Sequence, residues 1–179
     1  MTINESWGYN TGDDDWKSSR KLIHTLCEVA GRGGNLLLNV GPMGDGRLQP
    51  EVVERLADVG AWVAKHSESI VGTKPGLEPW QFYGPSTRRG RVGDRVDERV
   101  YLHLLMRPYD TVSVRGVPIR RLRSVRVLGS GDELTFETRA SIVDTFANPD
   151  PMGEVTIAVP EHAIDPHATV LALEFAEQP

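Results

Sequence analysis

The sequence contains a single cysteine, Cys27, among 179 residues. One cysteine excludes an intramolecular disulfide and any zinc site built from several cysteines. Cys27 lies on the apolar face of a predicted helix, which indicates a buried structural thiol rather than a reactive nucleophile.

Long apolar runs and an excess of positive charge are also missing. No stretch has the length and hydrophobicity of a membrane-spanning helix or of a signal peptide. Asp and Glu number 25 against 20 Lys and Arg, a formal net charge of −5, which argues against a general nucleic-acid binder. Five arginines occur close together, and we interpret them as a solvated strand face, with a site for acidic glycans or nucleic acid as the alternative. They are Arg115, Arg120, Arg121, Arg123 and Arg126.

Nothing in the sequence predicts a metal site or a cofactor. The five histidines share no ligand spacing, and no EF-hand pattern follows the aspartates at residues 13–15. The glycines of residues 31–46 lack the order of a phosphate-binding loop. Localisation stays open between the cytoplasm and secretion.

Residues 35–40 (NLLLNV) form a short apolar segment between two glycine-rich turns. A strand that is apolar on both faces belongs inside a parallel sheet covered by helices. The sequence predicts only this one strand of that kind, and a parallel strand needs neighbours. We therefore expect the chain to be the C-terminal part of a larger protein.

A helix is predicted on each side of this strand. The first spans about residues 16–30. Residues 13–15 (DDD) at its N-terminus are expected to cap its free N–H groups, and glycines end it. The second spans residues 50–66 and opens with Pro50. A helix, a buried strand and a helix are the repeating unit of an α/β barrel or of a doubly wound sheet. The predicted apolar faces consist of Leu22, Ile23, Leu26, Cys27 and Ala30 in the first helix and Val52, Val53, Leu56, Val59 and Val63 in the second.

The pattern changes after residue 73. Residues 74–79 read as a linker, and the following short runs alternate apolar and polar residues, with turn signals between them. Six or more such strands in about a hundred residues predict a small antiparallel β-sandwich. The inward-facing residues are predicted to be Val100, Leu102, Leu104, Val112, Val114, Val125, Val127, Leu134, Phe136, Val155, Ile157, Val159, Leu171, Leu173 and Phe175.

Several motifs occur in a recognisable order: residues 6–10 (SWGYN), 21–23 (KLI), 33–42 (GGNLLLNVGP) and 45–46 (DG). Together they resemble the closing section of the α-L-fucosidases of glycoside hydrolase family 29. The resemblance covers residues 1–76 almost without gaps. It continues over residues 80–176 through weaker motifs, such as WQFYGPST at residues 80–87.

This resemblance implies a fold and an activity. Residues 1–76 would form the C-terminal end of a catalytic (β/α)8 barrel, and residues 77–179 a C-terminal β-sandwich domain. The family removes terminal α-L-fucose by a retaining mechanism, in which one carboxylate attacks the anomeric carbon and a second acid protonates the leaving oxygen. Both carboxylates are expected upstream of this chain, so no catalytic residue is assigned here and the chain alone is expected to be inactive.

The resemblance assigns substrate binding to Trp7 and Asn39. Trp7 would form an aromatic wall against the C6 methyl group of fucose; the alternative is a tryptophan that anchors its loop in the core. Asn39 would orient a sugar hydroxyl or a catalytic carboxylate; the alternative is an asparagine that stabilises a turn. Tyr9 and Asn10 are expected to brace the loop, and Glu5 is not assigned as a catalytic acid.

The expected partner is a fucosylated glycan or glycoside, with no nucleic acid and no membrane. Without neighbouring strands, residues 35–40 are expected to leave unpaired edges and two apolar helix faces exposed, so residues 1–72 should be loosely held while residues 80–176 fold cooperatively. An upstream barrel segment or self-association is expected to cover the exposed edges. The alternative is a stand-alone carbohydrate-binding or interaction β-domain with a barrel remnant, which aromatic residues lining a groove would favour. Core packing is the simpler expectation for Trp80, Phe82, Tyr83, Tyr101, Tyr109, Phe136, Phe146 and Phe175.

Overall fold

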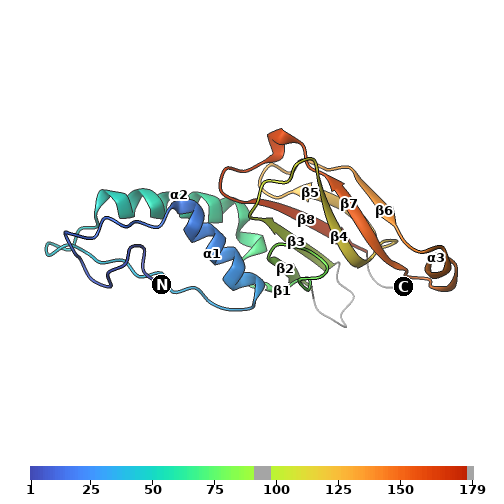
Figure 1. Cartoon of the computed structure of the whole chain (residues 1–179), viewed down its shortest axis with the longest axis horizontal. Helices are drawn as coiled ribbons and strands as arrows, with labels where there is room; N and C mark the ends of the chain where they lie inside the picture. Colours follow the sequence, from blue (N-terminus) through green and yellow to red (C-terminus); the bar gives the residue numbers. More distant parts are fainter. Residues whose placement is uncertain (91–97, 177–179) are drawn as a thin grey trace.

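A computed structural model of the chain describes residues 1–90 and 98–176. Residues 91–97 and 177–179, which belong to the predicted second domain, lie outside the described part. Figure 1 shows two helices beside a pair of β-sheets, with the first sixteen residues running below the helices. The elements are α1 (Ser19–Gly31), α2 (Pro50–His66), η1 (Ser67–Ser69), β1 (Lys74–Pro75), β2 (Ser86–Arg89), β3 (Glu98–Leu104), β4 (Thr111–Pro118), β5 (Leu122–Val127), β6 (Phe136–Arg139), α3 (Ile142–Ala147), β7 (Met152–Ala158), η2 (Glu161–Ala163) and β8 (Thr169–Phe175).

Helix α1 begins at Ser19, later than predicted. The Ser18 hydroxyl caps it by accepting a backbone hydrogen bond from the first turn. Before this cap the chain is not helical, and the N–H of Lys17 donates to the carbonyl of Ile3 (2.9 Å). The predicted capping role of the aspartates at residues 13–15 is therefore wrong, and they lie in the preceding loop.

Helix α2 has the predicted bounds, with Pro50 in its first turn. Its buried face differs from the prediction, because Val53 is exposed and Trp62 is buried. Val52, Trp62 and His66 are the buried residues of the helix. The indole N–H of Trp62 donates to the carbonyl of Ala168 (2.9 Å), so the helix is joined to the chain at the start of β8.

The strands form two antiparallel sheets that pack as a sandwich. One sheet has the order β1-β2-β3-β8-β5, and the other has the order β4-β7-β6. The predicted alternation is confirmed: all fifteen predicted inward-facing residues belong to the sandwich core or, for Phe136, pack against it. The segment predicted to be a linker contributes β1, which pairs with β2.

The outer face of the five-stranded sheet forms a second core with the helices. Strand β8 is central to this arrangement: Leu171 and Leu173 face the sandwich core, whereas Val170 and Ala172 face the helices. Most of the apolar residues of α1 and α2 are thereby covered, contrary to the expectation that these faces would be exposed, whereas Val53 of α2 remains exposed. This second core contains Ile23, Cys27, Trp62, Tyr101, Leu128, Ala168, Val170 and Ala172. Burial raises the pKa of the Cys27 thiol to about 12, as expected for a structural cysteine.

None of the helices in the described ranges is long and apolar enough to cross a membrane.

A buried polar chain joins the end of α2 to the sheet. The hydroxyl of Thr87 donates to the carbonyl of Ser69 (2.6 Å) and lies 3.2 Å from Nε2 of His103, which is fully buried. Since the Thr87 proton is used on Ser69, Nε2 of His103 must be the donor to Thr87. Burial, with a smaller effect from His66, lowers the pKa of His103 from 6.5 to about 3.

This buried histidine predicts acid sensitivity. The unfolded chain binds a proton at His103 below about pH 6.5, whereas the folded chain remains unprotonated there down to about pH 3. The free energy of unfolding should therefore decrease as the pH falls through this window, by about 1.4 kcal/mol per pH unit for the site. In His103→Gln, urea unfolding between about pH 6 and pH 4 should show a pH dependence that is smaller by about this slope. His162→Gln, which changes an exposed histidine, serves as the control, and an unchanged slope in His103→Gln would contradict the assignment.

Candidate functional site

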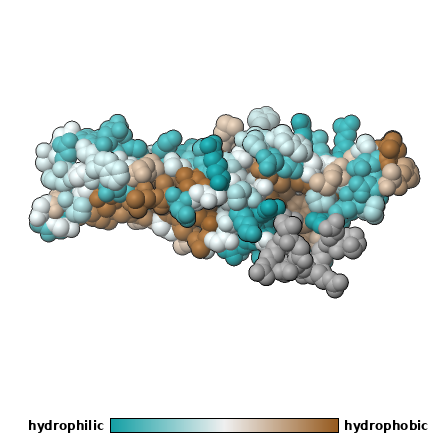
Figure 2. Space-filling model, turned by 90° about the horizontal axis from the view of Figure 1, so that it is seen from below, coloured by the Kyte–Doolittle hydropathy of each residue, from teal (hydrophilic) through white to brown (hydrophobic). Residues whose placement is uncertain are grey.

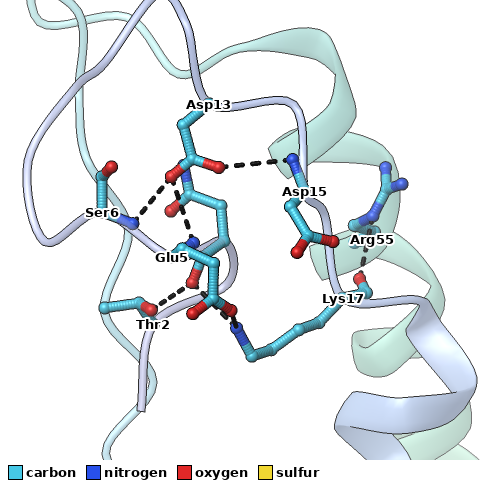
Figure 3. Close-up of polar contacts among 8 residues, drawn as sticks. Thr2, Glu5, Ser6, Asp13, Asp15, Lys17 and Arg55 are labelled. Atoms are coloured by element: carbon cyan, nitrogen blue, oxygen red, sulfur yellow. Dashed lines mark hydrogen bonds and ion pairs between the residues drawn. The ribbon is translucent and has the colours of Figure 1, made fainter.

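The loop of residues 5–13 carries Trp7, the first predicted site residue, and Asp13 holds the base of this loop. The carboxylate of Asp13 accepts hydrogen bonds from the backbone N–H groups of Ser6 (2.7 Å), Glu5 (3.1 Å) and Asp15 (3.3 Å) (Figure 3). A side-chain hydrogen bond from Ser6 is the main cause that lowers the pKa of this carboxyl, and the backbone hydrogen bonds act in the same direction. The charged form of Asp13 is therefore the one that organises the loop.

Lys17 ties the same loop to the helices. Its ammonium group donates to the carbonyl of Asn4 (2.9 Å) and forms an ion pair with Glu5 (2.6 Å). Its own carbonyl accepts a hydrogen bond from the guanidinium of Arg55 in α2 (3.0 Å; Figure 3). Glu5 thus has a structural partner at the base of the loop.

The tip of the loop displays aromatic side chains. Trp7 is 68% exposed and Tyr9 is 43% exposed. Asn10 braces the turn, since its amide donates to the Ser6 hydroxyl (3.2 Å) and its oxygen accepts from the N–H of Gly12 (3.0 Å). The indole of Trp7 is thus exposed on a hydrogen-bonded loop, and it is not anchored in the core as the alternative interpretation would require.

The second predicted site residue contacts the first. The side-chain amide of Asn39 donates to the backbone carbonyl of Trp7 (2.7 Å). Close by, Gly41 lies against the loop so tightly that a Cβ atom there would come within 2.5 Å of the backbone of Gly8. Two segments that are distant in sequence are therefore joined at the point where Trp7 projects.

Residues 35–40 do not form the buried strand that the sequence predicts. Only Asn39 makes a parallel bridge, to Thr2, and Leu37 is 74% exposed. The bridge is supported by hydrogen bonds from the N–H of Ile3 to the carbonyl of Asn39 (3.1 Å) and from the N–H of Asn39 to the carbonyl of Met1 (2.9 Å). Two short parallel segments cannot bury this stretch, because a stable parallel sheet requires further strands and helices over its faces.

Several large apolar side chains of residues 1–72 are exposed. Figure 2, which views the molecule from below, shows hydrophobic surface on the half that contains the helices. Trp7, Tyr9, Leu37, Val53 and Val71 are the exposed large apolar residues of residues 1–72. Apolar surface of this extent commonly marks an interaction or binding surface.

Metal-binding side chains do not cluster in the described ranges, where no group of three or more His, Cys, Asp or Glu residues could hold an ion. The aspartates at residues 13–15 do not converge on one point, since Asp13 accepts hydrogen bonds from backbone N–H groups instead.

Comparisons with known proteins point to one family. The profile of the family described as Alpha-L-fucosidase matches residues 1–68. An α-L-fucosidase of Branchiostoma floridae is 33% identical over 157 residues, which are 79% of this chain and 34% of that protein. The structure of α-L-fucosidase isoenzyme 1 from Paenibacillus thiaminolyticus is similar over 99% of this chain and 39% of that one, with 28% identity and a TM-score of 0.79. The structure of the Thermotoga maritima α-fucosidase in complex with fucose is similar over 97% of this chain and 38% of that one, with 27% identity and a TM-score of 0.69.

The chain thus spans about a third of the length of the curated relative and somewhat more of the solved structures. The similarity to the solved structures extends over both the helices and the β-sandwich, and the match to the family profile lies in the half that contains Trp7 and Asn39.

The hydrogen bonds of Asp13 predict the effect of removing its charge. Asp13→Asn retains one acceptor oxygen where the carboxylate offers two, so the loop of residues 5–13 should open more often. Amide exchange at Glu5, Ser6 and Asp15 should become about tenfold faster, the factor expected for the loss of one charge-assisted hydrogen bond. Asp14→Asn is the matched control, since it makes the same change at the neighbouring, exposed aspartate. Equal exchange in the two variants would show that Asp13 does not hold the loop.

Proposed function

The chain belongs to the α-L-fucosidase family, glycoside hydrolase family 29, and we propose that it forms the C-terminal part of a retaining, exo-acting enzyme that removes terminal α-L-fucose from glycoconjugates. The observation that carries the proposal is the loop of residues 5–13, which holds Trp7 exposed within the segment that the family profile matches. In a retaining enzyme the two reacting carboxyl groups stand about 5 Å apart on either side of the glycosidic bond. We propose that these groups lie upstream of residue 1 and that the 179 residues supply part of the substrate pocket.

We further propose that residues 1–76 form the end of a (β/α)8 barrel and residues 77–179 the β-sandwich domain. The parallel bridge between Thr2 and Asn39 supports the barrel assignment, because neighbouring barrel strands run parallel. The exposure of Leu37 supports it too, since the side chains of a barrel strand are covered on both faces in the closed barrel. The partner that covers this surface is proposed to be the remaining barrel strands.

Trp7 is proposed to contact the C6 methyl group of fucose. An apolar platform distinguishes a deoxy sugar from a sugar that carries a hydroxyl group at the same carbon, because burial of that hydroxyl without a partner is unfavourable. The amide of Asn39 is already bonded to the carbonyl of Trp7. Asn39 is therefore proposed to act mainly by positioning the Trp7 loop. The alternative role, an asparagine that stabilises a turn, is the same role under this proposal, because the stabilised segment carries Trp7.

A second candidate function rests on the aromatic residues of the β-sandwich. Core packing accounts for Phe82, Tyr101 and Phe175, which are buried, and for Phe136, which packs against the sandwich core. The expectation of core packing was wrong for four other aromatic residues, which are exposed: Trp80, Tyr83, Tyr109 and Phe146. A carbohydrate-binding or interaction role of the β-sandwich alone is the function that this observation favours.

The proposal predicts where activity resides. The 179-residue chain and the product of the longest in-frame reading frame that contains it should be assayed in parallel with 4-nitrophenyl α-L-fucoside. We expect hydrolysis by the longer product and none by the 179-residue chain, because the reacting carboxyl groups are proposed to lie upstream. Hydrolysis by the 179-residue chain would contradict the placement of these groups. A reading frame that is limited to these residues, together with fucose binding by the chain in titration calorimetry, would favour the binding-domain alternative.

The contact proposed for Trp7 predicts a change in selectivity. In the active product, Trp7→Ala should lower kcat/KM for the α-L-fucoside by about 10- to 100-fold, which is the usual range for loss of an apolar contact at a substrate methyl group. The activity toward the α-L-galactoside, which has a hydroxyl group at C6, should decrease less. Trp80→Ala, which removes an exposed tryptophan of the β-sandwich, is the control. A parallel decrease for both substrates would indicate that Trp7 supports the loop without contacting C6.

A further inference from the structure

The edge strands of the two sheets differ in how well they are protected from pairing with another chain. In the five-stranded sheet, β1 has only two residues, one of them Pro75. The other edge, β5, is covered by the returning chain, since Leu134 donates to the carbonyl of Val125 (2.8 Å) and Val127 donates to that of Asp132 (2.8 Å). Short, proline-containing or covered edges resist pairing with other chains.

In the three-stranded sheet, one edge is covered and the other is open. The segment before β2 covers β4: the N–H of Arg115 donates to the carbonyl of Gln81 (2.9 Å), and the Gln81 amide donates to the carbonyl of Gly116 (2.8 Å). The ring of Trp80 packs against Gly116, where a Cβ atom would lie only 2.5 Å from it. No comparable segment of the described residues pairs with the outer edge of β6.

The hydrogen-bond register identifies which groups of β6 face outward. The N–H of Ala158 donates to the carbonyl of Thr135 (3.0 Å), so residue 135 belongs to a hydrogen-bonded pair with β7. Such pairs alternate along an antiparallel ladder, and residues 137 and 139 therefore also direct their backbone groups toward β7. The N–H and C=O groups of Phe136 and Thr138 point to the open edge.

This geometry makes β6 complementary to itself. If two copies of β6 pair antiparallel with Thr138 on the two-fold axis, the outward groups of Thr138 bond to each other across the axis. Residue 137 of one copy then lies opposite residue 139 of the other, in a pair that makes no backbone hydrogen bonds and has close side chains. These residues are Glu137 and Arg139, so the pairing creates two symmetric pairs of opposite charge.

An exposed apolar surface continues from this edge. Helix α3 follows β6 directly and exposes Ile142 (75%), Val143 and Phe146 (87%). Figure 2 shows hydrophobic surface at the tip of the molecule where Figure 1 places α3.

The helix is held in a defined position although its apolar side chains lack a described partner. The carboxylate of Asp144 accepts a hydrogen bond from the N–H of Met152 (3.1 Å), and the Ser141 hydroxyl accepts one from the N–H of Asp144 (3.0 Å). The guanidinium of Arg120 donates to the carbonyl of Thr145 (2.8 Å). A fixed apolar surface needs little ordering on association, which favours binding.

We propose that the open edge of β6 and the adjoining face of α3 form a homodimer interface, with β6 pairing antiparallel to β6 of a second copy around Thr138. The self-complementary charges of Glu137 and Arg139 identify the second copy as the occupant. They also fix the register, because a shift by two residues along the strand loses both charge pairs. The interface is remote in sequence from the Trp7 loop and is independent of the proposed fucosidase activity.

Sedimentation velocity of the 179-residue chain tests the proposal. A species with twice the 19.8 kDa mass of one chain is expected. Thr138→Pro removes an N–H that points outward and so leaves the ladder with β7 intact; it should weaken the dimer by about tenfold or more. Arg139→Glu should also weaken the dimer, and Glu137→Arg combined with Arg139→Glu should restore it. A monomer in the unchanged protein, or self-association that none of these variants alters, would overturn the proposal.

Disulfide trapping gives a second readout that does not depend on a destabilising change. Cys27 is the only cysteine and is buried, so a new surface cysteine has no competing partner. Thr138→Cys should form a cross-linked dimer under mild oxidation, because paired strand residues on a two-fold axis lie within disulfide range. Thr111→Cys, at an exposed position of β4, should not. Equal cross-linking of the two variants would show that association does not use the β6 edge.

Discussion

The burial of both faces of β8 is the constraint on which the rest of the structure depends. Leu171, Leu173 and Phe175 fill the sandwich core from one face, and Val170 and Ala172 meet the helices on the other. Each buried aliphatic side chain of this kind contributes about 1.5–3 kcal/mol. A single strand therefore joins two cores, and the helices cannot separate from the sandwich without exposing the outer face of its larger sheet.

The proposed substrate-binding loop depends on this platform through a short series of contacts. Helix α2 is fixed on the sheet by Trp62, and Arg55 of the same helix bonds to the carbonyl of Lys17. Lys17 and Asp13 then hold the base of the loop that exposes Trp7. The β-sandwich thus supports the loop of Trp7 through the helices, although it contributes neither Trp7 nor Asn39.

The strand pattern could be predicted from the sequence because it depends on local alternation. Every second residue of each strand faces the same core, so runs such as Val100, Leu102 and Leu104 identify their own buried face. The helix faces were predicted less well. Trp62 was missed because an aromatic residue among small aliphatic ones does not alter the helical period, and its burial depends on the position of Ala168 in the fold.

The contact between the two candidate site residues could not be predicted from the sequence. The order of motifs identified Trp7 and Asn39, but the hydrogen bond between them joins positions 32 residues apart, which no local pattern reveals. The capping role predicted for the aspartates was wrong because Asp13 binds residues that precede it in the chain. The composition of residues 35–40 resembles that of a buried strand, and under the proposed barrel assignment it reflects neighbouring strands outside the described residues.

Hydrogen exchange across the whole chain is the most direct measurement of the shared platform. Residues 1–72 were expected to be loosely held as a unit, whereas the two cores joined by β8 imply that α1 and α2 are protected together with the sheet. Amides of α1, α2 and β8 should exchange with similar free energies of opening, and those of residues 35–40 should exchange much faster. Rapid exchange throughout α1 and α2, with protection confined to the β-sandwich, would contradict the account.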